Sequence, residues 1–287
     1  MAPGLKTSHI AAHPSGNLLV TLVNTPELWE VVPSTGPGNG SAQLVHHFAQ
    51  ADSVNGIAEL LPNVYAVIAS NSVWKVVYMS NHENVPAPAH VAKLPAGTLN
   101  GMAALDDGGR SVAISDSELG LVWRLDTHTG NYTVIHQDDT MAPTDDLGLQ
   151  LGINGLRIGN GYLYYNNSPK RIFCRVRIDG STGEALGPYE VVSRDVMADD
   201  FAIGPHGVGY LAGLIDNVVT RVFPNGTHNV IAGAHGSKEL MTATSAAFGR
   251  TQSDYRTLYI TTGGESEHPV DNTSTKGGKV MALSVDI

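Results

Sequence analysis

The sequence predicts an all-β fold, a six-bladed β-propeller with four-stranded antiparallel blades. A five-residue motif recurs six times and reads TSHIA, VNGIA, LNGMA, INGLR, ADDFA and ATSAA in chain order. Its second residue stands at positions 8, 55, 100, 154, 199 and 244, so successive copies are 47, 45, 54, 45 and 45 residues apart. A period of about 40–50 residues that holds four strands is typical of a propeller blade. Six such blades need nearly the whole chain, so a single domain over residues 1–287 is expected.

The motif copies are followed by hairpin patterns. In the fourth copy the turn Asn160-Gly161 precedes the aromatic run at 162–165, and turn residues between two short apolar runs indicate a hairpin. The strands expected on this basis are 10–11, 18–23, 28–32 and 43–48; 57–60, 64–69, 73–79 and 90–94; 102–105, 111–115, 121–125 and 132–136; 156–158, 162–165, 172–178 and 189–192; 201–203, 209–212, 218–223 and 228–232; 246–248, 257–262 and 279–285. Blade six is one strand short, and we expect the N-terminal segment to close the ring there.

Composition excludes two classes of partner. The formal net charge is −10 with only 17 Lys and Arg residues, which argues against a nucleic-acid partner because phosphate binding requires a clustered basic face. No apolar run reaches the roughly 18 residues of a membrane span.

The single cysteine, Cys174, alternates with Ile172 and Val176 and is expected to be a buried, inert thiol.

Five Asn-x-Ser/Thr sequons indicate a glycoprotein of the secretory pathway or the extracellular space. They stand at Asn39, Asn131, Asn166, Asn225 and Asn272. The start of the chain has neither the basic nor the apolar stretch of a signal peptide, so none is expected within this sequence.

The residues that enter the inner strands form a candidate site, because a propeller directs these positions toward its axis. They are Ser8 or His9, Asn55, Asn100, Asn154, Asp199, and Thr244 or Ser245. A second interpretation is open, since Asn-Gly also suits a tight turn whose residues need a positive φ.

Two long loops interrupt the blade period on the same face as these entry residues. Residues 137–152 enter blade four, and residues 263–278 are flanked by glycine pairs. Loops of this length in a compact domain are usually functional or disordered. We expect them to form a lid over the central opening, with Met141 and Leu147 in the first loop and His268 in the second as ligand contacts.

The blade pattern resembles the senescence-marker-protein, gluconolactonase and luciferin-regenerating family of six-bladed propellers. The most specific matches are INGL at 153–156 with YLYY at 162–165, and Asp199-Asp200-Phe201 through Gly207. The resemblance implies that Asn154 and Asp199 hold a divalent cation, commonly calcium, that Asp199 is the general base of lactone opening, and that Asn100 contacts substrate or metal. The family's metal-ligating Glu is absent, because the first entry reads Ser8-His9-Ile10.

A propeller of this family without its first metal ligand resembles the divergent members of fungal natural-product pathways. Some of these are hetero-Diels–Alderases that join a quinone methide to a terpene alkene, a reaction that needs no metal. The resemblance implies a metal-independent cyclase with no cofactor and an apolar, polyketide-like or terpene-like substrate. Hydrogen-bond donors would be Asn55, Asn100, Asn154 and Ser245, with Asp199 beside them; the substrate contacts would be His9, Met102, Leu156, Phe201, Met141, Leu147 and His268.

Two alternatives remain open. The first is a calcium-dependent lactonase or related hydrolase, with Asn154 and Asp199 as metal ligands. The second is a non-enzymatic propeller that binds a ligand through the same opening. No Gly-x-Ser-x-Gly motif, zinc-ligand spacing or Gly-rich phosphate loop is present, so those catalytic templates are not expected.

Overall fold

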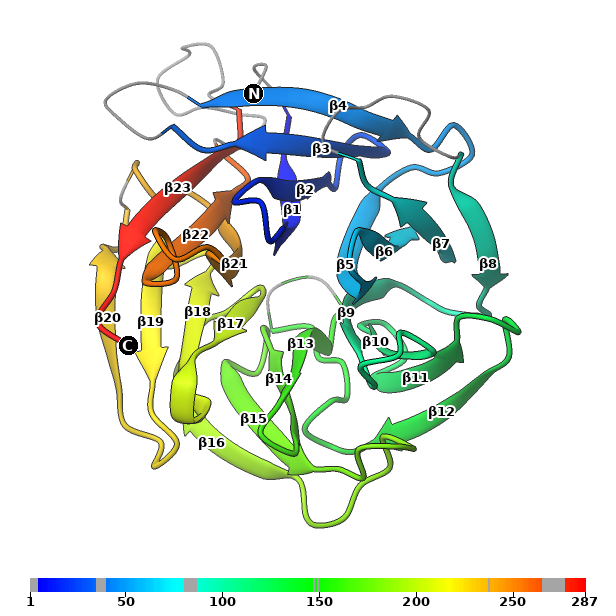
Figure 1. Cartoon of the computed structure of the whole chain (residues 1–287). Coiled ribbons are helices and arrows are strands. Elements are labelled where there is room, and N and C mark those ends of the chain that lie inside the picture. The colour runs from blue at the N-terminus through cyan, green and yellow to red at the C-terminus, as the bar shows by residue number, and fades with distance from the viewer. Residues whose placement is uncertain are drawn as a thin grey trace.

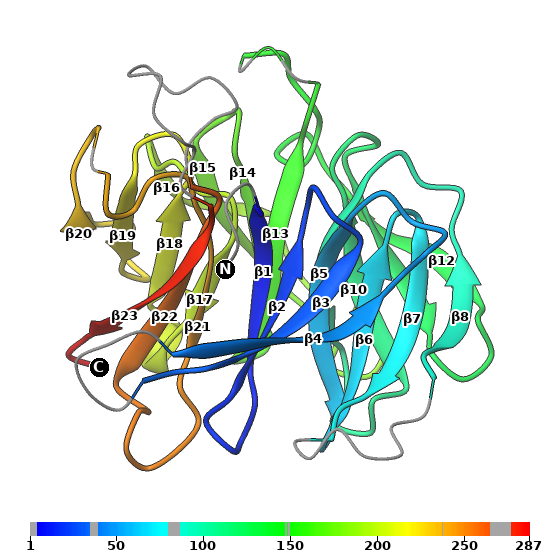
Figure 2. The ribbon, with the colours of Figure 1, turned by 90° about the horizontal axis from the view of Figure 1, so that it is seen from above.

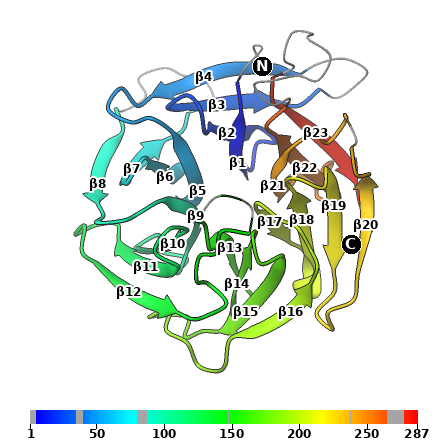
Figure 3. The ribbon, with the colours of Figure 1, turned by 180° about the vertical axis from the view of Figure 1, so that it is seen from behind.

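Six antiparallel sheets surround a central axis, as the sequence predicts (Figure 1). The structure is a computed structural model that describes residues 5–34, 40–79, 87–146, 148, 150–236, 238–264 and 277–287. In each sheet the strands follow chain order from the axis outward, and the view from behind shows the same order (Figure 3). The all-β propeller is therefore confirmed.

The first three blades each contain four strands. They are β1 (Thr7–Ala12), β2 (Leu18–Leu22), β3 (Glu27–Val32) and β4 (Ser41–His47); β5 (Val54–Leu61), β6 (Val64–Ala69), β7 (Ser72–Val77) and β8 (Ala89–Lys93); β9 (Leu99–Ala104), β10 (Ser111–Asp116), β11 (Leu121–Asp126) and β12 (Tyr132–Gln137).

The last three blades complete the ring. Their strands are β13 (Ile153–Gly159), β14 (Tyr162–Asn167), β15 (Ile172–Arg177) and β16 (Glu190–Arg194); β17 (Phe201–Ile203), β18 (Gly209–Gly213), β19 (Val218–Val222) and β20 (His228–Gly233); β21 (Ala243–Phe248), β22 (Thr257–Thr262) and β23 (Lys279–Ser284). A short 3₁₀ turn, η1 (Pro205–Gly207), precedes β18. Seen edge-on, the inner strands run between the two faces of the ring (Figure 2).

The ring closes where the first and last blades meet. Strand β1 packs against β21, and Gly278 N donates a hydrogen bond to Leu5 O over 2.6 Å. Within the described ranges blade six has the order β21-β22-β23, so no described residue pairs with the outer edge of β23. The N-terminal segment thus meets blade six beside the axis, whereas the expected fourth strand is not among the described residues.

Local turn chemistry explains the hairpin that joins β13 to β14. Asn160 and Gly161 have φ values of 53° and 77°, the two positive angles that a type I′ turn requires. This turn pairs Gly159 with Tyr162 and aligns the two strands in an antiparallel register. The hairpin expected from the Asn-Gly pair is confirmed here.

The Asn-Gly pairs of the motif itself have another cause. Gly56, Gly101 and Gly155 do not have positive φ values; they lie in strands whose pairing shifts register at the motif, as in a β-bulge. A Cβ on Gly101 would lie 2.7 Å from Leu156 N, and one on Gly56 would collide with Asn100 O. The turn interpretation is wrong at these sites, because glycine is needed where an inner strand nearly touches the next blade.

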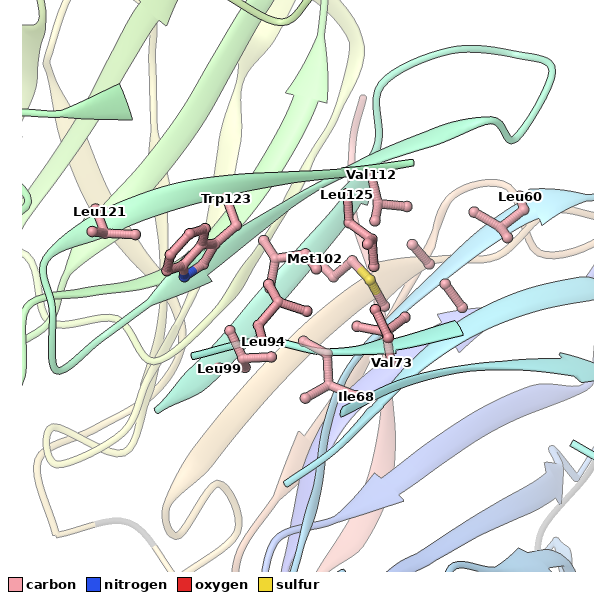
Figure 4. Close-up of a cluster of buried hydrophobic side chains, with 14 residues drawn as sticks. Leu60, Ile68, Val73, Leu94, Leu99, Met102, Val112, Leu121, Trp123 and Leu125 are labelled. Atoms are coloured by element: carbon pink, nitrogen blue, oxygen red, sulfur yellow. The ribbon is translucent and has the colours of Figure 1, made fainter. Parts of the chain in front are cut away.

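Hydrophobic cores fill the spaces between neighbouring blades. Figure 4 shows the core between blades two and three, where Met102 lies among side chains of both sheets. Leu156 and Met141 pack between blades three and four, and Phe201 packs edge to face on Phe173 with ring centroids 5.0 Å apart. The four residues expected to line a substrate cavity are each at most 2% exposed. That expectation is wrong for Met102, Leu156, Phe201 and Met141, which hold the blades together.

The first long loop is anchored to the blades that it joins. Gly152 N donates to Ser117 O over 2.6 Å, and Ile153 N donates to Met141 O over 2.9 Å. These bonds hold Met141 in the core, where a lid residue would not be.

Cys174 is fully buried, as expected, and burial raises the pKa of its thiol to about 12. In the part of the chain that the structure describes, no helix is long and apolar enough to cross a membrane.

The burial of Met141 gives a test of its role. Met141→Ala removes a fully buried side chain, so we expect the free energy of unfolding to fall by about 2–5 kcal/mol. Urea denaturation measures this loss. Met79→Ala is the matched control, because Met79 is 41% exposed and should change stability little. Equal, small effects of both substitutions would contradict the core assignment and restore a lid role.

Candidate functional site

The polar second residues of the six motifs lie where the inner strands begin, on one face of the ring that we call the mouth. They are Ser8, Asn55, Asn100, Asn154, Asp199 and Thr244. Several of them are joined across blades: Ser8 Oγ donates to Asn55 Oδ1 over 3.4 Å, and Asn154 Nδ2 donates to Asp199 Oδ1 over 2.8 Å. These polar groups therefore share one face of the ring.

Asn55 and Asn100 are the half-buried amides of this ring. Asn55 Nδ2 donates to Leu99 O over 2.9 Å, and Asn100 Nδ2 donates to Ser117 Oγ over 3.1 Å. An amide nitrogen carries two N–H groups, and the structure describes one bond for each. Each side chain thus retains one N–H that a bound molecule can accept.

Asn154 and Asp199 form a coupled pair in blades four and five. Asn154 is 5% exposed, and its Nδ2 also donates to Ser168 Oγ over 2.9 Å, so both of its N–H groups are used. Burial raises the pKa of Asp199 to about 7; the hydrogen bond from Asn154 opposes this shift, and the charge of Asp200 adds to it. Asp199 is therefore a carboxyl group whose two protonation states are similar in free energy near neutral pH.

A second polar cluster lies below the mouth and is centred on Asp200, which is fully buried. Its Oδ2 accepts hydrogen bonds from Arg157 Nη2 over 2.5 Å and from Ser245 Oγ over 2.6 Å. His9 Nε2 lies 3.7 Å from the same oxygen. We call these four residues the Asp200 cluster. It joins blades one, four, five and six across the axis.

The Asp200 cluster holds one compensated charge pair. Arg157 balances the buried carboxylate of Asp200, as a buried charge requires. Burial lowers the pKa of His9 to about 4; the charge of Asp200 opposes this shift, and that of Arg157 adds to it. His9 is consequently a neutral imidazole near pH 7, and its Nδ1 lies 2.9 Å from Ser8 Oγ.

Several predicted site residues thus have a different place from the expected one. Ser245 is fully buried and its hydroxyl donates to Asp200, so it is not a donor at the mouth. His9 is 4% exposed and faces the cluster, whereas a substrate contact was expected. Leu147 and His268 lie outside the described residues.

Asp200 and Arg157 are functional candidates that sequence reasoning missed. The signal was present in the motif: the fifth copy has Asp at the third place, where the other copies have Gly, Ser or His, and the fourth copy has Arg at the fifth place, where the other copies have Ala. Only the ring geometry brings these two places within hydrogen-bond distance of each other.

The donor set between Asn154 and Asp199 falls short of what calcium requires. Asn154 Oδ1 is buried and has no hydrogen-bond partner in the part of the chain that the structure describes, and Asp199 supplies one carboxylate. Calcium takes six to eight oxygen ligands, several of them charged. No group of three His, Cys, Asp or Glu residues suited to a metal is found in the described ranges. These residues alone do not make a calcium site, and we derive no reaction step through one.

A groove of about 1060 Å³ opens on the mouth face beside blade two. It runs between the end of β4 and the starts of β5, β7 and β9, and it reaches the polar ring at Asn55. Phe48, Trp74 and His90 are among the rings that line it. Its volume is close to the upper limit of about 1000 Å³ for small-molecule sites, so it has room for a substrate.

The sequons have unequal access to solvent. Asn131 and Asn225 are exposed, whereas Asn39 and Asn272 lie outside the described residues. Asn166 is 1% exposed, and its Nδ2 donates to Ala198 O over 2.7 Å. A glycan at Asn166 is incompatible with this packing, so the sequon count overestimates the available sites.

Comparison with curated protein sequences gives two relatives that share a name. No family model matches the chain. The protein named "Putative hetero-Diels-Alderase asR5" from Sarocladium schorii is 30% identical over 308 aligned positions, which cover 90% of this chain and 75% of that protein. A "Putative hetero-Diels-Alderase" from Phoma sp is 28% identical over 296 positions, covering 90% of this chain and 83% of the relative.

Solved structures share the fold. A luciferin-regenerating enzyme superimposes with a TM-score of 0.71 at 15% identity, covering 99% of this chain and 92% of that one. A gluconolactonase from Xanthomonas campestris gives a TM-score of 0.65 at 13% identity, with 98% and 87% coverage. Both confirm the six-bladed ring expected from the resemblance. With 30% identity to the first relative over most of both chains, this protein belongs to the hetero-Diels–Alderase family and has the fold of the gluconolactonase-like β-propellers.

Proposed function

We propose that this protein is a metal-independent cyclase that joins a quinone methide to a terpene alkene by an intermolecular hetero-Diels–Alder cycloaddition. The names of the two relatives support the reaction class. The observation that carries the proposal in this chain is the groove, because it has a volume of about 1060 Å³, opens on the mouth face and is lined in part by Asn55.

The chemistry makes few demands on the protein. The oxygen and the terminal carbon of the heterodiene each form one bond to the alkene, while three π bonds become two new σ bonds and one shifted π bond. No proton is transferred and nothing is oxidised or reduced. Catalysis therefore requires close approach of the two reactants, a hydrogen bond to the heterodiene oxygen, and exclusion of water that would add to the methide.

Asn55 and Asn100 meet the second requirement. Each has one amide N–H without a described partner and lies half-buried at the mouth. An N–H donated to the heterodiene oxygen stabilises the electron density that grows there as the alkene adds. Since Asn55 is held by Leu99 O and by Ser8 Oγ, its remaining N–H is oriented before the substrate arrives.

The groove meets the first and third requirements. Its floor is formed by aromatic and apolar residues between blades one and two, a surface on which planar and terpene-like reactants can bind side by side. Its walls remove much of each reactant from water. The Asp200 cluster lies outside the groove lining, so we propose a structural role for it in fixing the inner strands of blades one, four, five and six.

Removing the proposed donor should slow the reaction. We expect Asn55→Ala to lower kcat/KM for cycloadduct formation by about 10-fold to 100-fold, as for other preorganised donors. The assay mixes a quinone methide generated in situ with a sesquiterpene alkene and measures adduct above the uncatalysed rate by chromatography and mass spectrometry.

The matched control for this variant is Asn131→Ala. Asn131 is an exposed amide at the turn between β11 and β12, at the end of the blade away from the mouth. It should leave kcat/KM unchanged. No acceleration by the unaltered protein would contradict the cyclase; saturable binding of the reactants without acceleration would favour the non-enzymatic ligand-binding propeller.

A divalent-metal-dependent lactonase is the second candidate. One observation favours it: Asn154 Oδ1 is a buried oxygen with no hydrogen-bond partner among the described residues, on the side chain whose Nδ2 donates to Asp199. If a cation were bound here, Asn154 and Asp199 would be the residues that hold it, and it would supply Lewis-acid chemistry. The resemblance to gluconolactonases supports the same place.

Chelation separates the two candidates. We expect excess EDTA to change neither the rate of cycloaddition nor the thermal midpoint, because the proposed reaction uses no metal. A metal that stabilised only the folded state would lower the midpoint when EDTA removed it. Differential scanning fluorimetry and the adduct assay measure both. A lower midpoint with EDTA, together with calcium-dependent hydrolysis of gluconolactone that Asp199→Asn abolishes, would establish the lactonase instead.

A further inference from the structure

A row of four aromatic rings crosses the groove. His46 and Phe48 come from the outer part of blade one, and Trp74 and His90 from blade two. Their ring centroids are 4.7 Å apart for His46 and Phe48, 5.9 Å for Phe48 and Trp74, and 4.9 Å for Trp74 and His90. The pairs are tilted or edge to face, an arrangement that leaves ring faces available for a further ring.

Trp74 differs from the other two tryptophans. Trp29 Nε1 donates to Glu27 Oε2 over 2.8 Å, and Trp123 Nε1 donates to Asp116 Oδ2 over 3.1 Å. Trp74 is half-buried in the groove wall, and among the residues that the structure describes its Nε1 has no acceptor. A tryptophan N–H at a partly buried position usually finds a partner, so this one is available to a ligand.

Other donors lie close to Trp74 in the sheet. His90 is the strand partner of Trp74, and Lys93 is the partner of Ser72, two residues along β7. Both side chains line the groove, are exposed, and make no hydrogen bond or ion pair with the described part of the chain. The groove lining contains one acidic residue, Asp52, whose backbone N–H donates to Ser70.

This lining favours one kind of ligand. Ring faces select a planar conjugated ring, and three donor side chains without acceptors select oxygen atoms on it, the ammonium of Lys93 preferring an ionised one. A terpene alkene has no such oxygen and gains nothing from these donors.

We propose that the groove is the subsite for the planar, oxygen-bearing reactant, with its ring against Trp74 and its oxygens bound by Trp74 Nε1, His90 and Lys93. This assignment rests on the proposed function and deepens it, because it places the heterodiene partner in the groove and its reacting edge toward Asn55. Trp74 and Lys93 are then the residues that select this reactant by affinity.

Tropolone, a planar conjugated ring with a ketone and an acidic hydroxyl, is the probe. Its dissociation constant is measured by NMR titration of its ring protons against the full chain. We expect saturable binding, and we expect Trp74→Leu and Lys93→Met each to weaken it about tenfold, the loss of one stacked ring or one charge-assisted bond.

Two matched controls locate the effect. Trp29→Leu removes a half-buried tryptophan outside the groove lining, and Lys75→Met removes the lysine next to Trp74 that does not line the groove. Both should bind tropolone like the unaltered protein. Because Lys93 is exposed, Lys93→Met keeps the test valid if Trp74→Leu fails to fold.

Each outcome decides the inference. The absence of saturable binding, unchanged affinity in the groove variants, or equal losses in the groove and control variants would overturn it. Selective loss in the groove variants with no cycloaddition by the unaltered protein would retain this subsite and reject the proposed function. If the unaltered protein catalyses the cycloaddition but its binding of tropolone does not depend on the groove residues, the proposed function is retained and this subsite is rejected.

Discussion

The close approach of the inner strands around the axis is the constraint on which the rest of the structure depends. At the third place of the motif a side chain points at the next blade, and in blades two, three and four only glycine fits: a Cβ at Gly56, Gly101 or Gly155 would meet backbone or carboxylate atoms of the neighbour. The same strands shift register at this point, so each bulge turns the preceding polar side chain toward the mouth.

The other three blades have polar side chains at the third place of the motif, and these side chains lie together near the axis. Asp200 and Ser245 meet, His9 lies beside them, and Arg157 supplies the charge that lets a fully buried carboxylate persist. The buried ion pair of Arg157 and Asp200 is weak evidence that the folded state is stabilised. It does hold the two side chains in one arrangement, because removing either of them leaves an uncompensated buried charge. These polar contacts connect the inner strands of four blades across the axis.

The groove that we assign to substrate lies beside blade two. The apolar residues that were expected to line a substrate cavity, such as Met102 and Phe201, are buried in the cores between neighbouring blades. The groove beside blade two is open, with its row of rings, with donors that have no acceptor among the described residues, and with the amide of Asn55 in its lining; the amide of Asn100 lies at the start of the next blade. A cycloaddition suits this division, because it requires a shaped surface and a hydrogen bond more than a buried acid or base.

The sequence by itself determined the fold class, the number of blades, most strand positions and the face on which the polar ring lies, because all of these follow from local repeats: a fixed period, alternating burial and turn residues such as Asn160-Gly161. It also determined the buried state of Cys174. Only the tertiary structure decided which polar residues meet. Asp200 contacts Arg157 and Ser245, which lie 43 and 45 residues away along the chain, and the groove is formed by the ends of strands from three adjacent blades. Such contacts depend on how the sheets are placed around the axis, and no local pattern records that placement.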